Sequence, residues 1–407
     1  MKILVQKFGG SSLSSPEERE EAINHIQSAI SEGNCVCVVV SAMGRKGQSY
    51  ATDTLIGLIK ENGNHLSKRD WDLLLHCGEL ISAATLTSML NNRGISAVTL
   101  TGGQAGIVTD HAFGEAQIVD LKPERILEEF KQNKVVVVTG FQGRTKDWEV
   151  TTLGRGGSDT TATALGVALK AEMVDIFTDV DGVMTADPRI VEDATILQAV
   201  TYTEIANMAH QGAKVIHPRA VEMAMQGNVP IRIRSTFSQD TGTFVANRSA
   251  IRQLEPHLTE RLITGIANIS NITQIKVIAK DGQYDLQLRV FKAMAENGIS
   301  VDFINVNPIG VAYTVRDEVA EKATKVLQDM GFDPFLTPHC AKVSVIGAGM
   351  AGVPGVMAKV AEALTEKDIQ ILQCADSHTT IWVLVNDEDM VAAVRALHRK
   401  FHLHELI

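Results

Sequence analysis

The sequence predicts an α/β protein: a three-layer αβα domain with a mainly parallel sheet, followed by two smaller ferredoxin-like α+β units. Over roughly the first 240 residues, short apolar runs of strand length alternate with segments of helix length. A polar stretch at residues 247–260, which contains Pro256, interrupts this alternation. After it, one order of elements, β-α-β-β-α-β, occurs twice in segments of roughly 70 residues. The expected boundaries are 1–245 for the first domain, 246–261 for a linker, 262–338 for the first small unit and 339–407 for the second.

In the first domain, strands are expected at the apolar runs, because both faces of a parallel sheet are buried. These runs are Ile3–Phe8, Cys35–Val40, Ala97–Leu100, Val135–Thr139, Val174–Val180 and Pro230–Ser235. A proline between serines and glutamates is typical of a helix start, and residues 14–18 have this pattern. The expected helices are Pro16–Ile30, Asp70–Leu90, Lys122–Lys131, Ser158–Leu169 and Arg219–Gln226.

The two C-terminal units are expected to repeat a strand, a helix and a second strand region at matching positions. In the first unit these are Gln274–Ala279, Leu286–Asn297 and Gly298–Val306. In the second they are Lys342–Ile346, Val353–Lys367 and Asp368–Asp376. Units this small gain from pairing with a neighbour, because a short chain buries too little surface alone.

The composition is that of a globular protein with a sizeable core. Of 407 residues, 45% are hydrophobic and 21% are charged. A net charge of -10 disfavours nucleic acid and anionic membranes as partners. No apolar run approaches the ~18 residues of a membrane-spanning helix, and no signal-peptide segment precedes the first strand, so we expect a cytoplasmic protein. The five cysteines show no CxxC pair and no zinc spacing, so no metal site is expected from them.

The segment KFGGSS, Lys7–Ser12, directly follows the first expected strand and precedes a helix. Glycines let main-chain N–H groups approach phosphate oxygens, and a helix N-terminus adds partial positive charge. Lys7 supplies a full charge. The order of residues is not that of a Walker A motif. Two glycines after a strand are also common in a plain turn, so this segment alone leaves both interpretations open.

A second glycine-rich segment, Thr151–Thr163, reads TTLGRGGSDTTAT and runs into a helix. Ser158 or Asp159 alone is explained as a helix cap. Arg155 is not explained that way, and its guanidinium can hold a carboxylate through two parallel hydrogen bonds. Glu79, in the segment CGELIS, could face an ammonium group or simply be solvated. The segment Phe177–Arg189 follows a strand end, where doubly wound sheets bind ligands, although DG and DP are also ordinary turn signals.

Seven segments together resemble the aspartokinases of the amino-acid kinase family: KFGGSS, SAMG, CGE, GFQG, TTLGRGGSDTTAT, FTDVDGVMTADPR and GAKVIHPRA. They occur in the order seen in that family, and the two C-terminal units resemble a tandem of ACT domains. The resemblance covers essentially the whole chain. It implies ATP-dependent phosphorylation of the side-chain carboxylate of L-aspartate to 4-phospho-L-aspartate, on the route to lysine, diaminopimelate, threonine and methionine. Ser11 and Met184 depart from the family, which usually has threonine and often has tyrosine there, and RKGQSY is additional sequence.

The resemblance also implies roles for individual residues. Lys7 and Asp159 are the catalytic pair. The aspartate-binding set is Ser41, Thr52, Glu79, Arg155, Gly156, Gly157 and Ser158. The ATP-binding set is Lys7, Phe8, Gly9, Gly10, Thr178, Asp179, Met184, Arg189 and Lys214. ATP is a substrate and carries Mg²⁺, which usually keeps its waters and few protein ligands, so no dedicated metal residue is named.

The ACT-like units imply regulation by an end-product amino acid, with lysine, threonine and diaminopimelate as candidates. The candidate effector contacts are Ser300, Val301, Asp302, Gln370, Ile371 and Ser377. Association through these units implies a homo-oligomer.

Three other functions remain to be weighed. One is a kinase for another amino acid or a nucleotide; Glu79 and Arg155 favour aspartate. Another is a silent amino-acid sensor, which would not need the lysine, arginine and glycine set. The third is dinucleotide binding, because GAGMAG, Gly347–Gly352, follows a strand and Asp368 lies ~20 residues on. Roughly 55 residues follow that motif, too few for a dinucleotide-binding sheet or a fused homoserine dehydrogenase.

Overall fold

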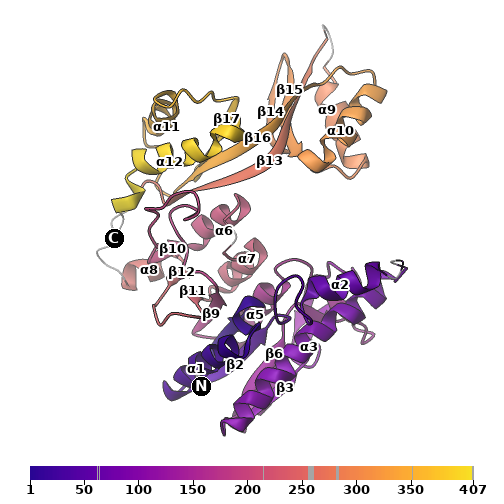
Figure 1. Cartoon of the computed structure of the whole chain (residues 1–407), viewed down its shortest axis with the longest axis vertical. Coiled ribbons are helices and arrows are strands. Elements are labelled where there is room, and N and C mark those ends of the chain that lie inside the picture. The colour runs from indigo at the N-terminus through magenta and orange to yellow at the C-terminus, as the bar shows by residue number, and fades with distance from the viewer. Residues whose placement is uncertain are drawn as a thin grey trace. The chain divides into compact units, whose positions relative to one another are not determined.

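The computed structural model describes residues 1–61, 63, 65–213, 215–254, 261–280, 284–350 and 352–405 (Figure 1). The chain divides into two compact units. The first comprises Met1–Val183, Ile196–Ala209 and Lys214–Leu258; the second comprises Met184–Thr195, His210–Ala213 and Thr259–Ile407. Two short segments from within the predicted first domain, 184–195 and 210–213, therefore belong to the second unit, which the sequence pattern did not predict.

An eight-stranded sheet forms the centre of the first unit, in the order β10-β12-β11-β9-β1-β2-β6-β3. Its strands are β1 (Ile3–Phe8), β2 (Cys35–Val40), β3 (Ala97–Leu100), β6 (Val135–Thr139), β9 (Met173–Thr178), β10 (Ala199–Thr201), β11 (Ile231–Ser235) and β12 (Thr243–Ala246). Neighbouring strands pair in parallel except β11 with β12. The predicted mainly parallel sheet is confirmed, and the strand expected to reach Val180 ends at Thr178.

Helices lie on both faces of this sheet, so the three-layer prediction is confirmed (Figure 1). In β2, Val36, Val38 and Val40 belong to the core formed with α1 (Pro16–Ser31) and α3 (Lys68–Asn92). On the opposite face, α5 (Gly157–Leu169) contacts β1, β2 and β9. The remaining helices of the unit are α2 (Thr52–Lys60), α4 (Glu124–Lys131), α6 (Tyr202–His210), α7 (Pro218–Gly227) and α8 (Arg248–Leu254).

A second, four-stranded sheet in this unit carries the glycine-rich loop that leads into α5. Its strands are β5 (Ile118–Leu121), β4 (Ile107–Thr109), β7 (Gln142–Arg144) and β8 (Val150–Thr152), in that order. β8 contacts α3, so this small sheet is fixed against a helix of the larger layer.

Among the described residues, α3 is the one helix long and apolar enough to cross a membrane by length and composition alone. Long core helices of globular proteins meet the same criterion. Here Ala83, Leu86 and Leu90 are buried in the core with α1 and the sheet, and Asp72 and Glu79 are buried polar residues of the same helix. We therefore interpret α3 as a core helix.

The second unit contains a six-stranded antiparallel sheet that joins the two predicted ferredoxin-like repeats. The strand order is β14-β15-β13-β16-β18-β17. The strands are β13 (Gly265–Ile278), β14 (Asp302–Asn307), β15 (Gly310–Arg316), β16 (Phe335–Ile346), β17 (Gln373–Asp376) and β18 (Thr380–Asn386). The helices are α9 (Leu286–Glu296), α10 (Asp317–Asp329), α11 (Val356–Thr365) and α12 (Met390–Lys400).

The two repeats share their central strands β13 and β16. Residues 272–278 of β13 pair with β15 of the first repeat, whereas residues 265–269 pair with residues 342–346 of β16, which also pair with β18 of the second repeat. Each repeat thus completes its sheet with part of the other's strand. The boundary predicted between residues 338 and 339 falls inside β16, and no sequence pattern indicated this exchange.

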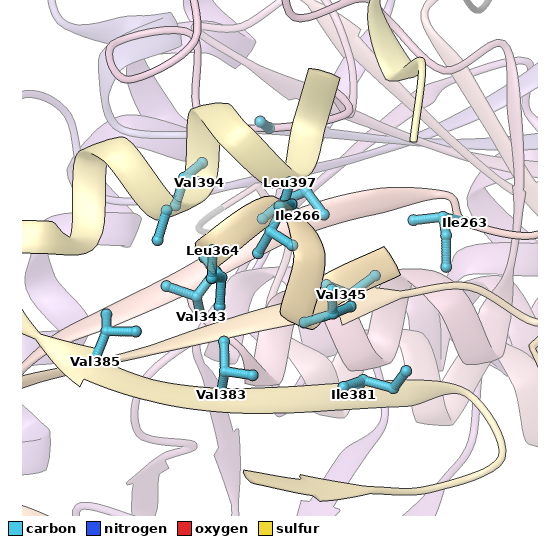
Figure 2. Close-up of a cluster of buried hydrophobic side chains, with 14 of the residues drawn as sticks. Ile263, Ile266, Val343, Val345, Leu364, Ile381, Val383, Val385, Val394 and Leu397 are labelled. Carbon is cyan, nitrogen blue, oxygen red and sulfur yellow. The ribbon is translucent and has the colours of Figure 1, made fainter. Parts of the chain in front are cut away.

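The second repeat has its own apolar core between the sheet and helices α11 and α12. Figure 2 shows Val343, Val345 and Val383 from β16 and β18 beneath Leu364 of α11 and Leu397 of α12. Ala186 and Val191, from the segment 184–195, belong to the same buried cluster. Thr185 accepts a hydrogen bond from the Ile266 main-chain N–H at 2.7 Å, so this segment is bound to β13.

The structure corrects the predicted linker. Residues 248–254 form helix α8, and Ile251 is buried with Ala199 and Ala246 of β10 and β12. Half of the expected linker is therefore part of the first unit's fold, and the mostly polar sequence of the segment did not indicate this.

The GAGMAG segment has a structural explanation. A Cβ at Gly347 would lie 2.2 Å from the main-chain oxygen of Leu262, and one at Gly349 would lie 2.7 Å from that of Arg261. Glycine is needed here because another stretch of backbone passes close by.

Candidate active site

The candidate site lies at the carboxyl ends of β1, β2 and β9, which are adjacent in the sheet. Gly10, just after β1, approaches the loop after β2: its Cβ would lie 2.7 Å from the main-chain oxygens of Ala42 and Gly44. The Gly44 N–H donates to the Gly10 oxygen at 2.9 Å. A side chain at residue 10 would push these two loops apart. The predicted phosphate-binding segment is therefore built by close contact between two strand ends.

Lys7 is held by Asp159. The Lys7 Nζ lies 2.7 Å from Asp159 Oδ1, and both side chains are mostly buried. Asp159, in the first turn of α5, accepts a second hydrogen bond at Oδ2 from the main-chain N–H of His217, at 3.3 Å. A Cβ on Gly9 would lie 3.4 Å from the lysine Nζ. The ammonium group is thus fixed directly beside the glycine pair.

Glu79 is the most unusual charged residue of the site. Its Oε1 accepts a hydrogen bond from the Ala42 main-chain N–H at 3.1 Å, whereas its Oε2 has no partner among the described residues. The side chain is 2% exposed. Burial raises the pKa of Glu79 to about 8, although the hydrogen bonds from main-chain groups oppose the shift. A buried carboxylate without a cation is costly, so this group is suited to receive one.

The loop Leu153–Gly156 presents Arg155 at the start of α5. Gly156 has φ +69°, and a Cβ there would lie 2.1 Å from the His217 ring. Both the left-handed backbone and the lack of space therefore require glycine. Arg155 is exposed, and we find no hydrogen bond or ion pair between it and any described residue. Its guanidinium is free to bind an anion.

Of the other residues in the predicted aspartate-binding set, Gly157 and Ser158 begin α5 directly after this loop, whereas Ser41 and Thr52 come from other segments. Ser158 is buried beneath Gly140, where a Cβ would lie 2.8 Å from the serine Oγ. Gly157 packs against Phe141. Ser41 follows β2, with its N–H bonded to the Phe8 oxygen at 3.1 Å, and Thr52 begins α2.

The predicted ATP-binding residues fall into three groups. Phe8 stacks on Phe177 with ring centroids 4.6 Å apart and lies in the core, and Thr178 ends β9. Asp179 is exposed and forms an ion pair with Arg45 at 2.7 Å. Met184 and Arg189 belong to the second unit, where Arg189 pairs with Asp187 at 2.6 Å. Lys214 lies outside the described residues.

Two groups in the site carried no role in the sequence analysis. His217 supplies a main-chain donor to Asp159 and its ring packs on Gly156; the segment GAKVIHPRA that contains it was singled out, but its side chain was not. The Ala42 N–H orients Glu79, and a main-chain donor of this kind leaves no signal in a sequence.

The six predicted effector residues lie in the second unit, at the start of β14, in the connections before β14 and β17, and directly after β17. Asp302 forms an ion pair with the buried Lys342. Ser377 Oγ accepts hydrogen bonds from the Thr379 and Thr380 main-chain N–H groups at 3.3 and 3.1 Å. Ser300 and Val301 precede β14, as Gln370 and Ile371 precede β17, so the two repeats present matching positions.

A cavity of about 350 Å³ lies beside these segments, lined by Gln274, Asn305, Leu372 and Gln373 among others. Gln274 Nε2 donates to Gln373 Oε1 at 2.7 Å, and Gln373 Nε2 donates to the Phe303 oxygen. The buried Gln274 Oε1 has no partner among the described residues. None of the six predicted effector residues lines this cavity, although Asn305 and Leu372 are close to them in sequence.

The first unit can therefore bring together an ammonium group on Lys7, main-chain glycine segments, an unpartnered carboxylate on Glu79 and a free guanidinium on Arg155. A ligand with both an ammonium group and carboxylates would pair with Glu79 and Arg155. An anionic phosphate chain would pair with Lys7 and the glycine segments.

Comparisons with known proteins agree with this geometry. Residues 2–235 match the family model described as "Amino acid kinase family", and residues 336–399 match "ACT domain". Aspartokinase 1 of Bacillus subtilis is 57% identical over 99% of this chain and 100% of its own length. The structure of E. coli aspartokinase III with aspartate and ADP has a TM-score of 0.78 at 25% identity, covering 98% of this chain and 99% of that one. The same enzyme with lysine and aspartate has a TM-score of 0.76 at 25% identity, covering 98% and 100%.

Proposed function

The chain belongs to the amino acid kinase family and, within it, to the aspartokinases, and from this premise we propose how its own residues transfer the γ-phosphoryl group of ATP to the side-chain carboxylate of L-aspartate. Lys7 and the Gly9–Gly10 segment hold the phosphate chain. Glu79 binds the α-ammonium group of aspartate, and Arg155 binds one of its carboxylates.

The unpartnered Oε2 of Glu79 is the observation that carries this proposal. A buried carboxylate with a pKa near 8 lacks only a cation. The α-ammonium group of an amino acid supplies that cation and leaves the two carboxylates pointing away. The Arg155 guanidinium on its glycine-rich loop can then hold one carboxylate in a bidentate geometry, which leaves the other to react. Ser41, Thr52, Gly156, Gly157 and Ser158 complete the proposed pocket.

Charge neutralisation is the main task in this reaction. The attacking carboxylate is ionised at neutral pH, so no general base is needed. A carboxylate oxygen forms a bond to the γ-phosphorus, the bond from that phosphorus to the β,γ-bridging oxygen breaks, and ADP leaves. Lys7 offsets the repulsion between the two anions, and Asp159 keeps its ammonium group in place. Phe8, Thr178, Asp179, Met184, Arg189 and Lys214 are proposed to bind the rest of the nucleotide.

Magnesium fits this site as a companion of ATP. Among the described residues, we find no group of three or more histidine, cysteine, aspartate or glutamate side chains arranged to hold a metal. Phosphate oxygens and water are its usual ligands in such sites. When bound, Mg²⁺ would reduce the charge on the phosphates.

The test is ATP-dependent formation of an acyl phosphate, trapped as a hydroxamate with hydroxylamine. We expect product with L-aspartate, and none with L-glutamate or N-acetylglutamate. Product with one of the other acceptors would instead identify another amino-acid kinase, and no product with any acceptor would leave an amino-acid sensor as the function.

We also propose feedback regulation through the second unit, by lysine, threonine or diaminopimelate. Support comes from the ACT domain match and from the E. coli structure with bound lysine. The orphan Gln274 oxygen beside a cavity is a suitable acceptor for an effector ammonium group. An effector changes activity only if it binds two conformations with different affinity. Adding each amino acid to the hydroxamate assay identifies the effector.

The remaining proposals concern organisation and context. We propose the domain boundaries 1–245, 262–338 and 339–407, with the exchange of strand segments described above. We propose a homo-oligomer that forms through the ACT domains, a cytoplasmic location, and a role in making lysine, diaminopimelate, threonine and methionine.

A further inference from the structure

Asp72 is a fully buried carboxylate on α3 that the proposed chemistry does not use. Its Oδ2 accepts hydrogen bonds from the main-chain N–H groups of Gly114 and Thr152, at 3.0 and 2.8 Å. Its Oδ1 accepts a hydrogen bond from Thr152 Oγ1 at 2.7 Å. One side chain thus satisfies three donors from two segments that lie far from it in sequence.

These donors are located at the base of the loop that carries Arg155. Thr152 is the last residue of β8, and the loop begins at the next residue. A Cβ on Gly154 would lie 3.3 Å from the main-chain oxygen of Gly114. The Gly114 segment therefore packs against the loop. Asp72 binds the main chain of both this segment and Thr152, the residue that precedes the loop.

Asp72 and Glu79 lie on the same face of α3. Seven residues span about two helical turns, or roughly 10 Å along the helix axis. A helix in the middle of a packed core is stiff over this length. The position of the Arg155 loop is therefore fixed relative to Glu79 through Asp72 and two turns of helix.

We propose that Asp72 is a positioning residue that sets the separation between the Glu79 carboxylate and the Arg155 guanidinium. It touches neither substrate. By holding the two groups that bind the α-ammonium group and the non-reacting α-carboxylate, it orients the amino acid so that its side-chain carboxylate faces the phosphates. This inference rests on the proposed function of Glu79 and Arg155.

The experiment compares three variants of the full chain. Asp72→Asn keeps the shape but removes the negative charge from all three hydrogen bonds, and it forces the Thr152 hydroxyl to turn and accept from the new NH₂ group. Thr152→Val removes one hydrogen bond and keeps the main-chain N–H. Glu129→Gln is the control: Glu129 is a buried carboxylate too, 2% exposed, and it pairs with Lys134 at 2.8 Å. Lys134 directly precedes β6, so this pair lies where the parallel strands begin, whereas the site lies at their carboxyl ends.

We expect Asp72→Asn to raise the KM for aspartate at least about tenfold and Thr152→Val to raise it about threefold. The KM for ATP should stay within about twofold in both, because Asp72 does not contact β1 or its glycines. All three variants should lower the Tm, but Glu129→Gln should leave the KM for aspartate unchanged. If Asp72 had a purely structural role, replacing it would lower the Tm without raising the KM for aspartate more than the KM for ATP.

Unchanged aspartate KM in folded Asp72→Asn and Thr152→Val would overturn the inference, as would equal rises in the KM values for aspartate and ATP. If Asp72→Asn does not fold, Thr152→Val alone decides. The hydroxamate assay of the wild type distinguishes a failure of this inference from a failure of the proposed function. If the wild type is active and the variants have unchanged KM values, only the positioning role is refuted. If the wild type is inactive toward aspartate, the proposed function is refuted as well.

Discussion

Replacing Glu79 by glutamine should stabilise the ligand-free protein and abolish its function at the same time. Glutamine has nearly the same shape, but it carries no charge at any pH. The folded wild type keeps the Glu79 proton up to a pKa of about 8, whereas the ordinary value is 4.5. Folding therefore binds a proton in this range, and the wild-type free energy of unfolding falls as the pH rises from about 4.5 to 8.

The size of the effect follows from the shift. A difference of about 3.5 pH units, at about 1.4 kcal/mol per unit, corresponds to about 5 kcal/mol when Glu79 is fully ionised in the folded protein, and to roughly 4 kcal/mol at pH 8, where it is half ionised. The stabilisation by Glu79→Gln should be close to zero at pH 4.5 and reach this value near pH 8. In a domain of this size, 1 kcal/mol shifts the Tm by about 2–4 °C. We therefore expect the variant to melt roughly 10 °C above wild type at pH 8.

The Tm of both proteins is measured by thermal denaturation from pH 5 to pH 8.5. Aspartate titrations on the same samples give the Kd. Binding of the ammonium group needs the ionised carboxylate, so the wild-type Kd for aspartate should fall about fivefold from pH 7 to pH 8, as the ionised fraction rises from about one tenth to one half. The variant should bind at least about 100-fold more weakly, with little pH dependence. Glu129→Gln is the matched control and should lose stability, because it breaks ion pairs with Arg125 and Lys134.

A Tm difference between Glu79→Gln and wild type that is the same at pH 5 and pH 8 would refute this reasoning. Tight aspartate binding by the variant would refute the proposed role of Glu79.

Three further predictions use the other groups of the site. Lys7→Ala should lower kcat by about 10²–10⁴-fold while aspartate binding persists, because Lys7 acts on the phosphates; near-normal turnover in the coupled ADP assay would contradict this. Arg155→Lys should raise the KM for aspartate about 10-fold or more, since lysine cannot make the bidentate contact, and an unchanged KM would argue against that contact. Gly156→Ala should lose more than about 2 kcal/mol of stability and most activity, because its Cβ would lie 2.1 Å from His217. Gly298→Ala is its control in denaturation experiments, with φ +66° and open space around the Cβ, and should cost about 1 kcal/mol; equal losses in the two variants would contradict the steric argument.

Much of the fold could be predicted because its elements leave local signals. The buried strands β1, β2 and β6 are continuous apolar runs, and the start of α1 has a capping box formed by Ser15 and Glu18. The expected bounds of these three strands agree with the structure, and the expected end of α1 at Ile30 differs from the structure by one residue. Sequence patterns of this kind report on neighbours a few residues away.

Long-range arrangements could not be predicted in the same way. The two halves of β13 look like one strand in the sequence, and only pairing with β15 and β16 shows that they serve different repeats. The segment 184–195 follows the first unit's strands, yet Ala186 and Val191 pack in the core of the second. In the site, Glu79 looked like an ordinary helical glutamate, because its burial and its missing partner exist only in the folded chain.

The most direct measurement is a crystal structure of the protein with L-aspartate and a non-hydrolysable ATP analogue. The proposed mechanism predicts the aspartate ammonium nitrogen about 3 Å from Glu79 Oε2, the Arg155 guanidinium on one carboxylate, and Lys7 beside the phosphates. An aspartate whose ammonium group binds elsewhere, with Glu79 Oε2 still unpartnered, would contradict it.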